Sequence, residues 1–286
     1  MTASPSLLIA GCGDVGSRLA RRALALGWRV HGLRRQVEAL PAGVLPVAAD
    51  LGEAARPAAW PHGELDYLVY CAAATRYDEA GYRLAYVDGL ARVLDWLAQA
   101  GQRPRRLLFV SSSGVYGQQG GEWIDEVSPA EAGDMSSVVM REAERLALGS
   151  GHPASVVRLT GIYGPGRNWL LNQVREGQWA LAQPPVFTNR IHAEDAAGLL
   201  ACLLEAEQRG AALDDCYLGV DDEPAALHEV VEWLRGRLDV AERAAEAGMR
   251  RSGSKRCSNA RARGLGWVPQ YPSYREGYAA VLADEG

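Results

Sequence analysis

Strand-like runs, most of them apolar, alternate with amphipathic segments of helix length over the first 160 residues of the chain. Runs of this kind predict strands, and the amphipathic segments between them predict crossover helices. The runs lie at residues 7–10, 29–33, 44–49, 67–72, 106–111 and 154–159. The run at 67–72 is apolar throughout, as is typical of a central strand covered on both faces. The pattern therefore predicts an α/β fold with a doubly wound parallel sheet of six strands.

Beyond residue 160 the pattern changes to shorter elements. The periodicity predicts helices near 170–174, 195–205 and 224–235, and strands near 190–192 and Tyr217. The segment 244–262 is polar and rich in helix breakers, which predicts a surface loop. We therefore expect residues 1–160 to form the sheet domain and residues 161–286 to form a smaller lobe, partly interleaved with the first, that faces a substrate.

A glycine-rich turn joins the first strand-like run to a helical segment at 17–24. In a dinucleotide-binding turn the first glycine permits the tight bend, the second leaves room for the pyrophosphate, and the third lets helix and strand pack closely. Three glycines stand at this spacing, so the sheet domain is predicted to be a Rossmann domain. The residues assigned to the cofactor here are Gly11, Cys12, Gly13, Asp14, Val15 and Gly16.

The second strand-like run ends in two arginines, Arg34 and Arg35, with no carboxylate to hold the ribose 2′-OH of NAD. Two guanidinium groups at this position suit a 2′-phosphate. The sequence therefore favours NADP(H) over NAD(H).

Composition and charge narrow the class of partner. The formal net charge is −5 with no long block of like charges, which argues against nucleic acid and membrane surfaces and favours a small molecule. The 5 cysteines are scattered without metal-ligand spacing, so no metal site and a reducing, cytoplasmic location are expected. No signal peptide or membrane-spanning run is recognisable.

Several further motifs occur in a characteristic order. They are 71–74 (CAAA), 109–117 (FVSSSGVYG), 158–166 (RLTGIYGPG) and 190–195 (RIHAED). With the glycine turn they make the chain resemble the extended short-chain dehydrogenase/reductase family, the NAD(P)-dependent nucleotide-sugar epimerases and dehydratases, over nearly its whole length. The resemblance implies a homodimer formed through the helices at 82–100 and 135–148. We add Asp50, Ala72 and Ala73 to the expected cofactor site.

The resemblance also assigns catalytic positions, and the residues at two of them differ from those of the family. Ser112 takes the place of the hydroxyl that binds the substrate oxygen, with Ser113 as the second candidate. The family's tyrosine–lysine acid/base pair is absent, because Ser136 stands at the tyrosine position and Met140 at the lysine position. Lys255 is the only lysine in the chain.

Other groups are candidates for the missing chemistry. Tyr116 is the first candidate for proton transfer, and Tyr163, His192 and Tyr77 are weighed beside it. Arg141 is expected to bind the cofactor ribose, since a guanidinium cannot shuttle protons. The arginine that clamps the pyrophosphate of nucleotide sugars is replaced by Thr188. The arginines considered as its substitute are Arg167 and the C-terminal Arg250, Arg251, Arg256 and Arg261.

Two functions from different classes remain open. The first is an NADP(H)-dependent oxidoreductase or epimerase-like enzyme in which Ser112 polarises a substrate oxygen, with a nucleotide sugar among the candidate substrates. The second is a redox-inactive NADP(H) sensor or scaffold, which the loss of the tyrosine and the lysine favours.

Overall fold

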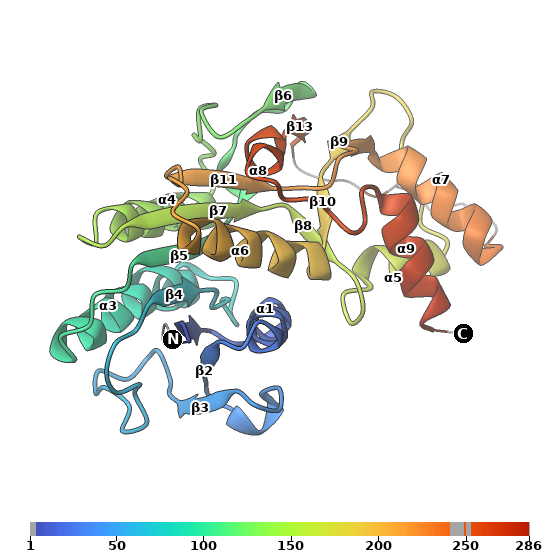
Figure 1. Ribbon diagram of the computed structural model, residues 1–286. Helices are drawn as coiled ribbons and strands as arrows, with labels where there is room; N and C mark the ends of the chain where they lie inside the picture. Colours follow the sequence, from blue (N-terminus) through green and yellow to red (C-terminus); the bar gives the residue numbers. More distant parts are fainter. Residues whose placement is uncertain (1–3, 241–248, 250–252, 286) are drawn as a thin grey trace.

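The computed structural model describes residues 4–240, 249 and 253–285. Its centre is a sheet of seven strands in the order β11-β7-β5-β4-β1-β2-β3 (Figure 1), and all neighbouring pairs are parallel. The strands are β1 (Ser6–Ala10), β2 (Arg29–Arg34), β3 (Leu45–Ala48), β4 (Tyr67–Tyr70), β5 (Arg106–Ser112), β7 (Ala154–Leu159) and β11 (Cys216–Gly219). The order steps outward from β1 on both sides, so the predicted doubly wound parallel α/β fold is confirmed.

Alternate residues of the central strands enter two apolar cores, one on each face of the sheet. In β1, Ile9 belongs to the core under α1 (Asp14–Ala25) and α6 (Ala193–Gln208), whereas Leu8 belongs to the core under α3 (Gly89–Gln99) and α4 (Met135–Leu148). Successive strand residues point to opposite faces, so a strand covered on both faces must be apolar throughout.

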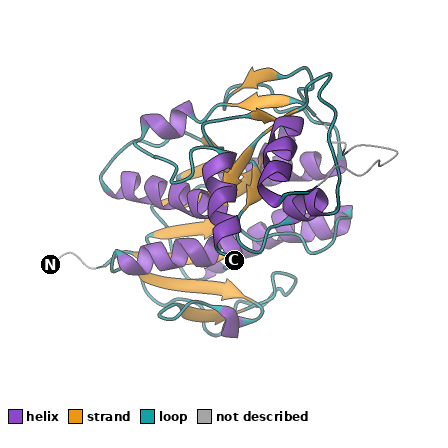
Figure 2. Ribbon diagram, turned by 90° about the vertical axis from the view of Figure 1, so that its right-hand side faces the viewer, coloured by secondary structure: helices purple, strands orange, loops and turns teal. Residues whose placement is uncertain are grey.

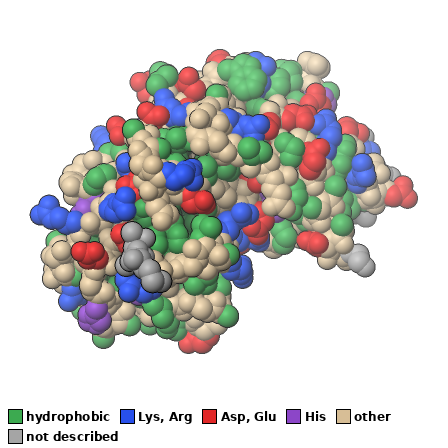
Figure 3. Space-filling model, viewed as in Figure 1, with side chains coloured by type: hydrophobic (Ala, Val, Ile, Leu, Met, Phe, Trp, Pro, Cys, Tyr) green, Lys and Arg blue, Asp and Glu red, His purple; other side chains and the backbone are tan. Residues whose placement is uncertain are grey.

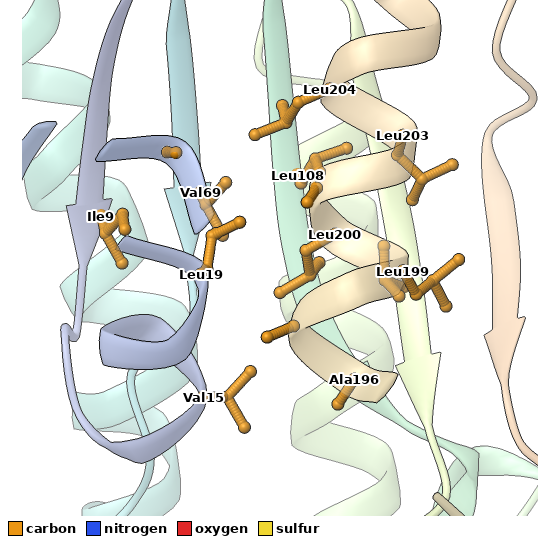
Figure 4. Close-up of a cluster of buried hydrophobic side chains, with 14 of the residues drawn as sticks. Ile9, Val15, Leu19, Val69, Leu108, Ala196, Leu199, Leu200, Leu203 and Leu204 are labelled. Carbon is orange, nitrogen blue, oxygen red and sulfur yellow. The ribbon is translucent and has the colours of Figure 1, made fainter. Parts of the chain in front are cut away.

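Figure 4 shows the first of these cores at the level of side chains. Leucines on one side of α6 lie beside Leu108 of β5, while Leu19 of α1 lies next to Ile9 and Val69. The α1 and α6 helices also pack against each other. The helix that carries the glycine turn is therefore held from two directions.

The seventh strand, β11, was predicted near Tyr217 but was assigned to the smaller lobe and not to the six-stranded sheet. β11 pairs with β7 at the edge of the sheet, and it follows residue 160 in the chain, as α6 does. Both elements lie in the layers of the seven-stranded sheet. The domain boundary at residue 160 stays a prediction.

Three further helices gather at one side of the sheet, which Figure 2 turns toward the viewer. α5 (Trp169–Arg175), α7 (Leu227–Leu238) and α9 (Tyr274–Ala283) surround a third apolar core that contains Tyr163, Val230 and Tyr278. Three short sheets adjoin it: β8 (Gly161–Tyr163) with β10 (Arg190–His192), β9 (Phe187–Thr188) with β12 (Ala225–Ala226), and β6 (Glu122–Ile124) with β13 (Lys255–Cys257).

The surface loop predicted at 244–262 is corrected by the structure in its described part. Residues 255–257 form β13, which pairs with β6, and α8 (Ala260–Gly264) follows it. A short strand needs only a few residues and its partner, so the polar composition of the segment hid it. Residues 244–248 and 250–252 of the predicted loop lie outside the described residues.

The surface carries both signs of charge. Acidic and basic side chains are interspersed over the face shown in Figure 3. Within residues 4–240, 249 and 253–285, no helix has the length and apolarity needed to cross a membrane. The same residues contain no cluster of three or more His, Cys, Asp or Glu side chains that could hold a metal ion.

Candidate functional site

A cavity of about 900 Å³ lies at the carboxyl ends of the central strands. In a doubly wound sheet this edge is where ligands bind, at the point where the strand order reverses. Many residues that the sequence assigned to the site line it: Gly11, Gly13, Asp14, Val15, Gly16, Arg34, Arg35, Asp50, Ala72, Ala73 and Ser112. The fold thus brings together residues from five strand ends.

The glycine turn is built so that a ligand can approach its backbone. Gly11 has a φ of +84°, and a Cβ there would lie 2.3 Å from the backbone nitrogen of Ala72. By contrast, a Cβ on Gly13 would meet nothing nearer than the Gly11 carbonyl oxygen at 3.9 Å. The space beside Gly13 is therefore open, and it fits an external group. A dinucleotide's pyrophosphate is the group that this turn suits.

The first turn of α1 can bind an anion. Gly13 precedes the helix and no side chain caps it. The backbone N–H groups of the first helical turn lack carbonyl partners within a helix, and the helix dipole adds positive potential at this end. These amides and the open space at Gly13 lie on the same cavity wall.

Charged side chains surround this helix end. Asp14 accepts hydrogen bonds from Arg18 Nε at 2.8 Å and from Arg167 Nε at 2.6 Å. Although burial opposes it, these hydrogen bonds lower the pKa of Asp14. Arg18 also pairs with Glu194 at the start of α6. Arg167 also lines the cavity. Its hydrogen bond to Asp14 connects the loop after β8 to the glycine turn.

The two arginines at the end of β2 face the same cavity. Arg34 Nη1 donates to the Cys12 carbonyl oxygen at 3.2 Å, and Arg35 Nη1 lies 4.0 Å from Asp50 Oδ2. Cys12 itself is fully buried beneath the turn and does not line the cavity. Its contribution to the site is the carbonyl that orients Arg34.

The three serines at the carboxyl end of β5 have different surroundings. Ser112 lines the cavity, and its Oγ accepts from the Gly114 backbone nitrogen at 3.0 Å. Ser111 also lines the cavity, but its hydroxyl donates to Glu144 Oε1 at 2.6 Å. Ser113 is not part of the lining. Of the two serines that the sequence put forward, only Ser112 has a hydroxyl at the cavity.

A buried ion pair supports this serine segment from below. Arg158 donates to both carboxylate oxygens of Glu144, at 2.9 and 2.7 Å, and their side chains are 12% and 6% exposed. Arg158 Nη1 also donates to the Tyr116 hydroxyl at 2.8 Å. The strand β7 and the helix α4 are tied together here, directly behind Ser111.

Three residues expected in the site lie outside it. The Tyr116 hydroxyl donates to the Asp125 carbonyl oxygen at 2.9 Å, so this phenol is committed to a structural bond. The Ser136 hydroxyl donates to Asp134. Arg141 Nη1 donates to the carbonyl oxygens of Ala130 and Ala132. The expectation that these three residues face the ligand is therefore corrected.

His192, Tyr163, Tyr77 and Lys255 do not line the cavity either. His192 caps α6 through Nδ1, which accepts from the Glu194 nitrogen at 3.2 Å, and burial lowers its pKa to about 4. Tyr163 is buried and its hydroxyl donates to the Ser273 carbonyl oxygen at 3.4 Å. Tyr77 is 86% exposed. Lys255 Nζ donates to the Tyr116 carbonyl oxygen at 2.8 Å.

Two cavity residues have roles that sequence reasoning did not assign. Met140, which the family resemblance places at the lysine position, lines the cavity and is 5% exposed. Tyr86 also lines it, from the π-helical segment η2 (Arg83–Asp88) that precedes α3. Its residue type was a signal, since a phenol can carry a proton, but the sequence predicts one regular helix over 82–100.

The chain is similar to proteins of known class. The profile of the NAD dependent epimerase/dehydratase family matches residues 7–219. A 3-diazoavenalumate denitrifying reductase from Streptomyces sp is 28% identical over 308 residues, which cover 95% of this chain and 98% of that protein.

Solved structures agree with this match. A protein described as an NAD-dependent epimerase/dehydratase from Methylobacillus flagellatus has 37% identity and a TM-score of 0.81, with 99% of both chains covered. MoeE5 in complex with UDP-glucose and NAD has a TM-score of 0.79 over 97% of both chains, but at 22% identity the likeness extends to the fold alone.

Proposed function

Because the chain belongs to the NAD dependent epimerase/dehydratase family, we propose that it is an NADP(H)-dependent reductase that works without the family's tyrosine–lysine pair. A nicotinamide dinucleotide is the cofactor that this family membership implies. The observation that carries the cofactor proposal is the open space at Gly13 beside the uncapped start of α1. These backbone groups would hold the pyrophosphate, and Arg167 would add a positive charge beside it.

The choice of NADP(H) depends on the end of β2. Arg34 and Arg35 both line the cavity, and Arg34 is oriented by the Cys12 carbonyl. An oriented guanidinium can make two hydrogen bonds to a phosphate, whereas a ribose hydroxyl offers it only a weak partner. The 2′-phosphate is therefore the group that this pair of arginines fits.

Reduction is favoured over epimerisation by the acid/base groups in the cavity. An epimerase that oxidises a sugar hydroxyl must remove its proton, which requires a base near the reacting carbon. The carboxylates in the described lining are Asp14, at the glycine turn, and Asp50, after β3, and the lining contains no histidine or lysine. The similarity to a reductase supports the same direction.

Ser112 is proposed to orient the substrate oxygen. Its Oγ accepts from the Gly114 nitrogen, which leaves the hydroxyl proton to donate to an oxygen in the cavity. A nucleotide sugar stays a candidate substrate. However, Thr188 cannot clamp a pyrophosphate by charge, and the neighbouring Arg190 is buried outside the cavity. Cytoplasmic location and a homodimer also stay proposals, and light scattering of the pure protein tests the second.

A redox-inactive sensor of NADP(H) is kept as the second candidate function because of Met140. An uncharged side chain at the lysine position removes the group that would tune a nearby acid. NADPH absorbance, followed with and without electron-poor carbonyl compounds and UDP-glucose, separates the two functions. Oxidation with any of them supports the reductase, whereas firm binding without oxidation supports the sensor.

The Arg34→Ala variant tests the cofactor choice. We expect it to weaken NADPH binding by about 10- to 100-fold, because one charge-assisted contact to the 2′-phosphate is lost. NADH binding should hardly change. Arg29→Ala, at the opposite end of the same strand and exposed, is the matched control and should affect neither. Dissociation constants from calorimetry give the answer, and wild-type protein that binds NADH more tightly than NADPH contradicts the proposal.

A further inference from the structure

We propose that Tyr86 is the proton donor of the reductive reaction and that a carbonyl compound is accordingly the class of substrate. This inference rests on the proposed function, because the reduction needs a bound reduced cofactor. Tyr86 lines the same cavity as Ser112 and Met140. Tyr86 belongs to η2, whereas Ser136, at the position of the family's missing tyrosine, belongs to α4.

Tyr86 lies within a local change of helix type, from α-helix to π-helix, that has an identifiable cause. The Tyr70 hydroxyl donates to the Ala85 carbonyl oxygen at 2.5 Å, within the π-helical segment η2. Gly89 leaves room for this approach, since a Cβ there would lie 2.5 Å from the Tyr70 hydroxyl. A side chain that enters the hydrogen-bond ladder of a helix distorts it. Single π turns are frequent at functional sites.

The position of Tyr86 places it near the altered pair. The segment η2 packs against α4, the helix that carries Met140, and Tyr86 packs on the same apolar core as Met140. The Tyr86 hydroxyl accepts a long hydrogen bond of 3.4 Å from the Ala74 backbone nitrogen. Its own O–H proton has no acceptor among the described residues, so it is available to a ligand.

The other acids in the described lining are unsuited to donate a proton at neutral pH. Asp14 is ionised, because its hydrogen bonds from two arginines lower its pKa despite burial. Burial raises the pKa of Cys71 far above its usual value, and its Sγ donates to the Gly11 carbonyl at 3.2 Å. Asp50 accepts from the Gly52 nitrogen beyond β3, beside Arg35. Arginine does not release its proton.

The protonation state of Tyr86 sets the direction of the chemistry. Burial raises its pKa above the usual 10, while the hydrogen bond from the Ala74 nitrogen opposes this. No lysine lowers the pKa, because Met140 occupies that position. The phenol therefore stays protonated at neutral pH, where it can give a proton but cannot take one.

The proposed step balances in atoms and charge. When bound, a reduced nicotinamide supplies a hydride, which carries two electrons. The carbonyl carbon gains this hydride as the C=O π bond breaks, and the oxygen takes the phenolic proton from Tyr86 while Ser112 donates a hydrogen bond to it. Tyr86 then regains a proton from water. The sum is one carbonyl compound, one NADPH and one proton giving one alcohol and one NADP⁺.

The experiment compares Tyr86→Phe with Tyr82→Phe, using NADPH and 4-nitrobenzaldehyde as the probe. Tyr82 is a matched control. The centre of its ring lies 5.4 Å from that of the Tyr86 ring, but Tyr82 does not line the cavity. We expect Tyr86→Phe to lower kcat by about 100-fold or more, the usual contribution of a general acid. KM, the NADPH dissociation constant and the unfolding midpoint should stay close to wild type, and Tyr82→Phe should match wild type throughout.

Two further measurements identify the donor by its pKa. In wild type the reduction rate should be flat from about pH 6 to about pH 9, while oxidation of 4-nitrobenzyl alcohol by NADP⁺ should rise about tenfold per pH unit, because it needs the phenolate. Independently of activity, the tyrosinate absorbance of wild type minus that of Tyr86→Phe, with NADP⁺ present, should show one phenol that ionises above pH 10.

The outcomes separate the two proposals. Equal turnover by Tyr86→Phe and wild type, or a phenol at position 86 that is already ionised at neutral pH, overturns the assignment of Tyr86 and leaves the reductase proposal standing. Wild-type protein that binds NADPH but does not oxidise it with the aldehyde contradicts the proposed function itself.

Discussion

Replacing Gly13 with alanine is expected to weaken NADPH binding by at least about 100-fold, since the added methyl group fills the space beside the α1 amides and two charge-assisted hydrogen bonds to the pyrophosphate are lost. The folded protein should tolerate the change, because the new Cβ would meet no protein atom nearer than 3.9 Å. Calorimetry with NADPH, beside thermal unfolding without it, measures both effects.

Gly11→Ala is the structural counterpart of this variant. Its Cβ would lie 2.3 Å from the Ala72 nitrogen, at a φ of +84°. Strain and overlap together should cost on the order of 3 kcal/mol or more of stability, so this variant should unfold early even without ligand. If Gly13→Ala binds NADPH as wild type does, the turn does not hold the pyrophosphate and the cofactor proposal loses its main support.

Replacing Glu144 with glutamine is expected to destabilise the protein by about 3–5 kcal/mol, because it leaves the Arg158 guanidinium buried without its charge partner. The two side chains are 6% and 12% exposed, so water cannot replace the lost carboxylate. Ser111 also loses its charged acceptor, so the cavity wall next to Ser112 should loosen. Urea unfolding at neutral pH measures the loss of stability.

A second ion pair on the same helix supplies the control. Arg83 and Glu142 make two hydrogen bonds between η2 and α4, but both side chains are 38% exposed. Solvent screens such a pair, so Glu142→Gln should leave the urea midpoint nearly unchanged. Adding Arg158→Met to Glu144→Gln should recover part of the loss, since an apolar side chain suits the buried site better than an unpaired charge. Equal effects of the two glutamine variants would refute this account.

Cofactor site and proton donor differ in how far the sequence could predict them. The residues of the glycine turn lie within six consecutive positions, so their spacing was sufficient to recognise the turn in the sequence. The proton donor could not be predicted in this way. The position of Tyr86 depends on Tyr70, a residue 16 positions earlier in the chain on β4, whose hydroxyl bonds to the backbone of η2.

The sequence by itself determined the alternation of strands and helices, because side-chain periodicity reports local geometry and burial directly. It also showed that residues 117–162 contain no tyrosine and that Lys255 is the only lysine, which is the basis for placing Ser136 and Met140 at the family's tyrosine and lysine positions. Only the tertiary structure decided that 216–219 completes the sheet and that 255–257 pairs with β6. The strand near Tyr217 was predicted but not its place in the sheet, and the strand at 255–257 was missed. Both strands are short and pair with segments distant in the chain, and no local pattern records which segment a strand pairs with.

Hydrogen bonds also explain why several candidate side chains lie outside the cavity. Tyr116, Ser136 and Arg141 were plausible by position, yet each is held by hydrogen bonds away from the cavity. Hydrogen-bond partners are set by which segments meet in space. Local order along the chain therefore gave the fold class and the glycine turn, and the meeting of distant segments decided which hydroxyl groups line the cavity.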